Sequence, residues 1–205
     1  MKKILGIVGV VLLAVSSCAS SPSPSAGVTR IDASTQTDLS GYWNDTDVRI
    51  VCQSLINDCL SSPRVDQAIR AMSGKTPTVL VGSFKNESSE HIDTSIITST
   101  METTIFNSGK IDFVAGGSTR NELRAERQDQ QSNASEATAS ALANETGANF
   151  MLFGSVKTII DKAGNQTVRT YFVNAEMTNV ETNQRMWMGQ NNEIKKVIVQ
   201  AKNKL

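Results

Sequence analysis

The sequence predicts an α/β domain in which helices pack on a mixed sheet of four or five strands. From about residue 40 to residue 147, helical patterns alternate with short apolar runs, an order typical of parallel strands joined by helices. After residue 150, strand-like runs follow one another across tight turns, which indicates an antiparallel meander. The 205 residues suit one such domain with appendages better than two domains.

The charge balance and the histidine count argue against several classes of function. Twenty Lys and Arg residues balance twenty Asp and Glu residues, and no dense basic block occurs, so we expect no nucleic-acid partner. His91 is the single histidine of the chain. Since histidine is the commonest acid-base residue and metal ligand, this count argues against many enzyme classes and against a metal site.

The N-terminus has the pattern of a lipoprotein signal peptide, residues 1–17. Two lysines precede an uncharged stretch, residues 4–15, whose twelve residues would span about 18 Å as a helix, too short for a bilayer core of roughly 30 Å. The sequence Val15-Ser-Ser-Cys18 resembles the lipobox of bacterial lipoproteins, so Cys18 is the expected lipidation site. The alternative is an ordinary signal peptide with an incidental cysteine.

The residue after the lipidated cysteine bears on localisation. In the sorting rule of Gram-negative lipoproteins, aspartate at this position retains the protein in the inner membrane. Here the residue is Ala19, so we expect an outer-membrane protein, anchored through lipid, with its domain in the periplasm.

Residues 18–39 are rich in Ser, Thr, Pro, Ala and Asp and contain few large aliphatic side chains. Such a segment cannot bury enough apolar surface to offset the entropy of ordering, so we expect a flexible tether. Drawn out fully, it would reach at most about 70 Å. Residues 40–205 then form a single globular domain with a short basic tail.

Two helices are expected at the start of the domain. Residues 48–60 place apolar side chains at helical spacing, with Thr46 or Asp47 as the N-cap. Pro63 ends this helix, and a short second helix covers residues 65–72.

Cys52 and Cys59 both lie on the apolar stripe of the first helix. Seven helical residues separate their Cα atoms by about 10.5 Å, beyond the roughly 7 Å that a disulfide tolerates. We therefore favour two buried thiols, and a disulfide would require the helix prediction to be wrong.

A strand, a helix and a second strand follow. Residues 78–84 form a short apolar run that predicts a buried strand. Residues 92–106 carry a helical apolar stripe that ends at Gly109, a glycine placed for a C-cap. Residues 111–114 predict a second strand.

Two further helices are predicted before the meander. Thr119-Arg-Asn-Glu122 has the spacing of a capping box and opens a charged helix that extends to about Gln130. Asn133-Ala-Ser-Glu136 opens another helix, which ends at Gly147.

Three strands close the domain. Residues 150–160 are strand-like, a turn forms around Gly164-Asn165, and residues 168–178 alternate between apolar and polar side chains. The last strand carries residues 186–188, and residues 195–205 form a basic, weakly patterned tail.

No catalytic motif stands out. No serine lies in a nucleophile elbow, and neither the Walker nor the dinucleotide-binding glycine spacing occurs. We therefore expect a non-enzymatic protein that needs no cofactor. Paired carboxylates of the glycosidase kind stay open, since nothing singles out two of them.

Polar segments with aromatic residues are the better candidates for binding. Tyr42 and Trp43 lie where the tether meets the domain, and both types are favoured interface anchors. The alternative, which we favour for this pair, is a hydrophobic staple onto the first helix.

The polar loop after the first strand, residues 85–91, is the second candidate. It holds Asn86, Glu87, Glu90 and His91 at the carboxyl end of a strand, where α/β sheets often bind. A merely solvated connection is equally compatible with this composition.

Three segments together resemble a known family. They are residues 40–47 (SGYWNDTD), residues 81–93 (VGSFKNESSEHID) and residues 146–154 (TGANFMLFG). With the lipobox, they resemble the lipoprotein activators of bifunctional penicillin-binding proteins, the LpoB type, over roughly residues 40–195.

This resemblance implies a non-catalytic outer-membrane lipoprotein that binds a peptidoglycan synthase and stimulates it. It also implies a fold similar to the N-terminal domain of TolB, and we expect a monomer. A structural subunit of an envelope or secretion complex, of the curli-exporter kind, is the alternative. Such a ring would need several amphipathic strands of about 9 to 11 residues, and only residues 168–178 alternate well.

Overall fold

The computed structural model describes residues 29–133 and 146–201. The compact unit begins at Ser34, and the described residues before it belong to a separate unit. Cys18 and most of the helix predicted over residues 133–147 lie outside the described residues. Among the described residues, no helix is long and apolar enough to cross a membrane.

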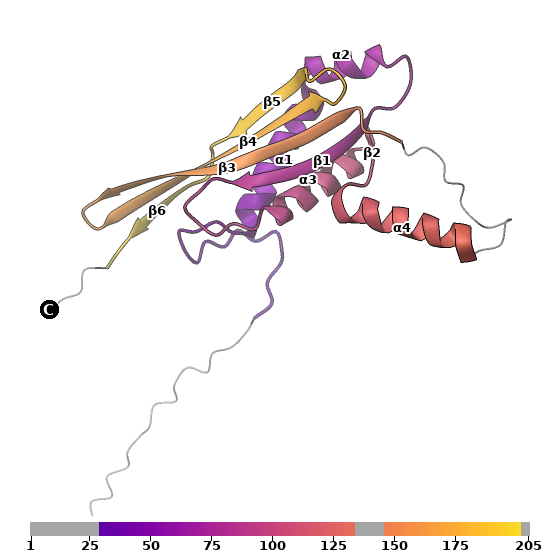
Figure 1. The fold of residues 1–205 in the computed structure, drawn as a ribbon. Helices are drawn as coiled ribbons and strands as arrows, with labels where there is room; N and C mark the ends of the chain where they lie inside the picture. Colours follow the sequence, from indigo (N-terminus) through magenta and orange to yellow (C-terminus); the bar gives the residue numbers. More distant parts are fainter. Residues whose placement is uncertain (1–28, 134–145, 202–205) are drawn as a thin grey trace, which may run out of the picture. The chain divides into compact units, whose positions relative to one another are not determined.

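In its described residues, the compact unit is an α/β fold with four helices and a mixed six-stranded sheet (Figure 1). In chain order the elements are α1 (Asp45–Ser61), α2 (Pro63–Ala71), β1 (Thr78–Asn86), α3 (Thr94–Ser108), β2 (Asp112–Phe113), α4 (Gly117–Asn133), β3 (Phe150–Ala163), β4 (Gln166–Asn179), β5 (Arg185–Asn191) and β6 (Lys195–Val199).

The sheet order is β2-β1-β3-β4-β5, and β6 pairs with the other end of β4. The β1–β2 and β1–β3 pairs are parallel, whereas β3–β4, β4–β5 and β4–β6 are antiparallel. The predicted change from parallel units to an antiparallel meander is therefore confirmed. The tight turn at Gly164-Asn165 is also confirmed, because Ala163 pairs with Gln166 across it.

Two predictions about the end of the chain need correction. Over residues 29–133 and 146–201 the sheet has six strands rather than four or five, and the extra strand, β6, comes from residues expected to form a basic tail. The residues Lys195–Val199 are too few and too exposed to show a strand pattern on their own. Their order comes from pairing with β4, from Gln166 to Thr170.

The start of α1 also differs from the prediction. Asn44, and neither Thr46 nor Asp47, is the N-cap, and Asp47 is the third helical residue of a capping box. The Asn44 side chain accepts a hydrogen bond from the Asp47 N–H at 3.1 Å, and Asp47 accepts one from the Asn44 N–H at 2.9 Å. Pro63 ends α1 as predicted and is also the first residue of α2.

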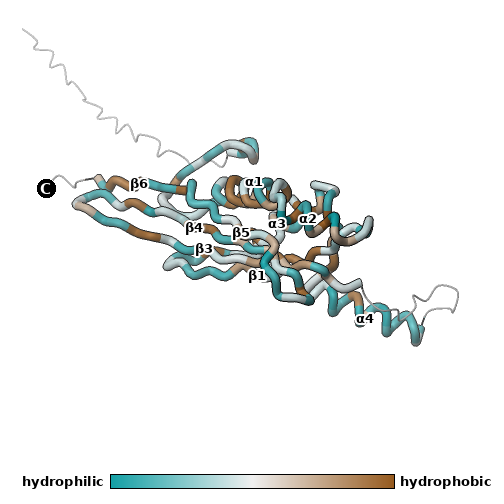
Figure 2. Tube along the Cα trace, turned by 90° about the horizontal axis from the view of Figure 1, so that it is seen from above, coloured by the Kyte–Doolittle hydropathy of each residue, from teal (hydrophilic) through white to brown (hydrophobic). Residues whose placement is uncertain are grey.

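One face of the sheet packs against α1 and α3, and the other face is open (Figure 2). Alternate residues of β3 and β4 point into the helix-covered core, among them Leu152, Val173 and Met177. Helix α1 is tied to β5 by the Trp187 indole, whose N–H donates to Asp58 at 2.8 Å.

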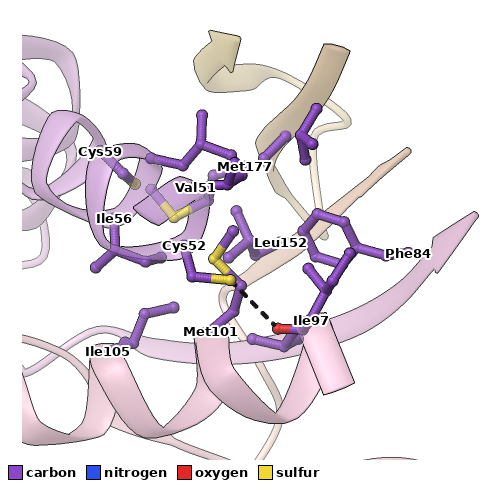
Figure 3. Close-up of a cluster of buried hydrophobic side chains, with 14 of the residues drawn as sticks. Val51, Cys52, Ile56, Cys59, Phe84, Ile97, Met101, Ile105, Leu152 and Met177 are labelled. Atoms are coloured by element: carbon purple, nitrogen blue, oxygen red, sulfur yellow. Dashed lines mark hydrogen bonds between the residues drawn. The ribbon is translucent and has the colours of Figure 1, made fainter. Parts of the chain in front are cut away.

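Cys52 and Cys59 lie in this core as free, buried thiols (Figure 3). The Cys52 thiol donates to the Ile97 carbonyl at 3.9 Å and so links α1 to α3. Burial raises the pKa of both thiols to about 12, which keeps them protonated and poorly nucleophilic.

Gly154 of β3 lies opposite Phe84 of β1 and Ala175 of β4. A Cβ at this position would meet the Asn174 carbonyl oxygen and the Phe84 ring. Neither neighbour can move without disturbing the sheet, so only glycine fits here.

We predict that Gly154→Ala lowers the free energy of unfolding by about 2 kcal/mol or more. The matched control is Gly147→Ala, where an added Cβ meets nothing within 4 Å. Urea denaturation of both variants checks the prediction, and equal stability of the two would contradict the steric argument.

Candidate partner-binding surface

A partly buried polar cluster joins the start of the domain to the β1–α3 loop and to β4. We call it the junction cluster, and it consists of Gly41, Tyr42, Trp43, Glu90, Arg169 and Tyr171. It brings together three of the residues predicted as partner-binding candidates, Tyr42, Trp43 and Glu90. Of the other three, Asn86 ends β1, and Glu87 and His91 lie in the β1–α3 loop that follows.

Glu90 is the centre of the junction cluster. Its two carboxylate oxygens lie 2.9 Å from the Tyr171 hydroxyl, and one of them accepts a bond from the Trp43 N–H at 3.3 Å. Arg169 Nε lies 3.5 Å from Glu90 Oε1, an ion pair too long for a good hydrogen bond. The Glu90 side chain is only 6% exposed, so its carboxylate stabilises the fold and offers little surface to a partner.

Tyr171 is fully buried on β4 and packs against Trp43, with ring centroids 5.2 Å apart. Its single hydroxyl proton goes to the Glu90 carboxylate, while the Gly41 carbonyl lies slightly farther away, at 3.2 Å. Burial, and then the bond to Glu90, raise the pKa of Tyr171 far above its ordinary value. The hydroxyl therefore remains a permanent donor.

The pair Tyr42 and Trp43 was predicted to act either as interface anchors or as a hydrophobic staple, and the two side chains differ in their surroundings. Trp43 directly precedes the N-cap of α1, is half-buried and packs against the core, as expected of a residue in the staple position. Tyr42 is 55% exposed, and the Arg169 guanidinium carbon lies 4.0 Å from the centroid of its ring. Of these two residues, Tyr42 is thus the one that a partner could reach.

A second set of polar residues, centred on Lys196, holds the segment just before α1. Lys196 of β6 lies 2.6 Å from the Asp47 carboxylate and 3.0 Å from Asp38, and it donates to the Tyr42 carbonyl at 2.8 Å. Burial raises the pKa of Asp47, whereas the bond to Lys196 lowers the pKa of exposed Asp38. Asp38, from the segment expected to be a tether, thus takes part in this group.

The β1–α3 loop is shaped by Asn86. Its side-chain oxygen accepts bonds from the Ser88 N–H at 3.0 Å and from the Ser88 hydroxyl at 2.6 Å, and its amide donates to the Glu90 carbonyl at 2.7 Å. This network directs the Glu90 side chain into the cluster. Glu87 and His91 remain exposed, and Glu87 forms a surface ion pair with Lys157 at 3.1 Å.

The open face of the sheet carries a shallow concavity of about 560 Å³. Its lining combines apolar, polar and charged side chains, including Phe153, Met188, Asn174, Gln190, Lys85 and Glu87. Glu87 therefore borders both the β1–α3 loop and this face. Within residues 29–133 and 146–201, no group of His, Cys, Asp and Glu is placed to hold a metal ion.

Sequence reasoning missed Arg169, Tyr171 and Lys196 as members of these clusters. Arg169 and Tyr171 were visible as one polar and one aromatic residue at the end of an alternating strand, but their partner Glu90 lies about eighty residues away. Nothing in the sequence marked Lys196 as a member of a cluster, because its strand was not predicted.

The described residues form an α/β domain, and the candidate binding residues lie in the junction cluster and around the β1–α3 loop. The family model described as "Peptidoglycan-synthase activator LpoB" matches residues 47–193. The chain belongs to this family, whose members are non-catalytic activators of peptidoglycan synthases. The resemblance seen in the sequence is confirmed.

Solved structures from several bacteria are similar to the chain. The C-terminal domain of LpoB from Escherichia coli is 17% identical, with a TM-score of 0.43, and the match covers 75% of this chain and 99% of that one. The NMR structure of E. coli LpoB is 17% identical, with a TM-score of 0.37 and coverage of 97% and 96%.

Lipoprotein GNA1162 from Neisseria meningitidis is 16% identical, with a TM-score of 0.39 and coverage of 62% and 88%. No curated protein sequence matches the chain.

We predict that Glu90→Ala lowers the free energy of unfolding by about 3 kcal/mol, because it leaves Arg169 and the Tyr171 hydroxyl buried without their carboxylate. The control, Glu87→Ala, removes an exposed ion pair and should cost less than about 1 kcal/mol. Chemical denaturation of both variants is the measurement. A Glu90→Ala variant as stable as the control would show that the cluster does not support the fold.

Proposed function

We propose that this chain is a monomeric outer-membrane lipoprotein, anchored through Cys18, whose periplasmic domain binds and activates a bifunctional penicillin-binding protein. The observation that carries the proposal is the family match over residues 47–193, which spans nearly the whole folded domain. The lipobox Val15-Ser-Ser-Cys18 supports the anchor, and Ala19 supports the outer membrane. The likeness to the TolB N-terminal domain is part of the same proposal.

The contact surface follows from which candidate residues are exposed. Glu87 and His91 project from a loop that Asn86 holds in shape, and Tyr42 lies on the junction cluster with more than half its surface exposed. A pre-shaped loop loses little conformational entropy on binding, which favours affinity. Trp43 and Glu90 support this surface from beneath.

The length of chain between the lipid anchor and the domain limits how far the domain can lie from the membrane. Between Cys18 and Ser34, where the compact unit begins, sixteen peptide links would extend at most about 55 Å. We infer that the partner is engaged close to the anchoring membrane.

We predict that Cys18→Ala abolishes incorporation of a palmitate analogue, because the thiol that accepts the lipid is gone. Metabolic labelling followed by immunoprecipitation is the measurement, with Cys52→Ala as the matched control, since that thiol is buried in the core. Equal labelling of the wild type and Cys18→Ala would refute lipidation at Cys18.

We predict that the purified protein raises the rate at which the cognate bifunctional synthase polymerises lipid II, and that Tyr42→Ala combined with His91→Ala weakens the effect. Losing an exposed anchor residue should reduce affinity by about tenfold or more. Glycan polymerisation with labelled lipid II is the assay, and Ile96→Ala, an exposed aliphatic residue on α3, is the control. No stimulation by the wild type would overturn the proposed function.

A further inference from the structure

Along part of its length, strand β3 has no described strand beside it on one side. We call the position that such a strand would take the empty row. β1 pairs with β3 only as far as Asn86 and Val156, and its last bond runs from the Glu87 N–H to the Val156 carbonyl at 2.9 Å. β3 continues to Ala163 and there pairs with β4 alone. In Figure 1, β3 and β4 run on past the end of β1. Among the described strands, none occupies the row that β1 leaves.

The register shows which backbone groups face this row. Val156 bonds toward β1, and the groups of successive strand residues alternate between the two sides. Thr158, Ile160 and Lys162 therefore direct their N–H and C=O groups into the empty row, whereas the residues between them bond to β4. The free edge is about 17 Å long, the length of a five-residue strand.

The first side chains of this edge lack the usual protection. Edge strands are commonly blocked by proline, by charged side chains, especially lysine, or by bulges. Here Thr158, Ile159 and Ile160 are β-branched, with Ile159 60% exposed and Ile160 38% exposed. Asp161 and Lys162 are charged, but they lie at the tip of the hairpin.

We propose that an extended segment of the peptidoglycan synthase adds to this row as a strand, in line with β1. This proposal rests on the proposed function and assigns a binding mode to it. Main-chain hydrogen bonds to Thr158, Ile160 and Lys162 supply affinity, and the alternating side chains supply selectivity. The segment carries aliphatic residues beside Ile159 and Ile160 and an acidic residue beside Lys162.

Two features favour the synthase over a second copy of this chain. A strand pair of five residues buries far less than the roughly 1,200 Å² that a stable interface needs, so an edge-to-edge dimer would be weak. A larger partner also contacts the β1–α3 loop, because Glu87 lies at the upstream end of the empty row. The edge and the loop then form one continuous surface.

The test uses a proline at the edge. Ile160→Pro removes one N–H that faces the row and leaves the β3–β4 bonds in place, since proline is tolerated on edge strands. The matched control is Val197→Pro on β6, whose N–H by the same alternation faces away from β4. We expect Ile160→Pro to weaken binding to the purified synthase by at least about tenfold and Val197→Pro to change it less than about threefold.

Hydrogen exchange on the wild type tests the same mode without a variant. On adding the synthase, the amide protons of Thr158, Ile160 and Lys162 should become protected, while that of Val197 should not.

The outcomes separate the two proposals. If the wild type does not bind the synthase, the proposed function and the edge both fail. If it binds, and neither Ile160→Pro nor exchange protection sets the β3 edge apart from the β6 edge, only the edge assignment fails. Light scattering that shows a dimer dissociated by Ile160→Pro would assign the row to a second copy and overturn the synthase strand.

Discussion

The buried Glu90 carboxylate organises the region where the chain enters its domain. It receives the Tyr171 hydroxyl from β4, the Trp43 N–H from the segment before α1, and the charge of Arg169. These partners come from two parts of the sequence, β4 and the segment before α1, so one carboxylate ties three segments together when its own loop is included. A carboxylate this deeply buried is tolerated only because its oxygens are paired, and the cluster is therefore stable only as a whole.

The sequence predicted the order of elements because the signals for them are local. The stripe on α1, the glycine that ends α3 and the alternation along β4 all arise within windows of about fifteen residues. Gly109 has a φ of 64°, the left-handed conformation that its predicted C-cap role requires. β6 was missed for the opposite reason, because its residues acquire order only by pairing with β4.

The sequence predicted which residues belong to the candidate site but not what each of them does. Tyr42, Trp43 and Glu90 were singled out as polar and aromatic residues near segment ends, and the structure brings them together. The sequence could not show that Glu90 points inward, because its partner Arg169 lies 79 residues away. A buried acid and an exposed acid look alike in a polar loop, and only the register of β4 distinguishes Glu90 from Glu87.

The same loop that stabilises the domain also leaves the β3 edge free. Asn86 ends β1 and holds the Glu90 carbonyl at 2.7 Å, which turns the chain toward the junction cluster and away from β3. The turn that follows Asn86 therefore accompanies both the inward position of Glu90 and the end of the β1–β3 pairing. If the proposed partner strand fills the row beside Thr158–Lys162, it lies directly against the loop that Asn86 holds in shape.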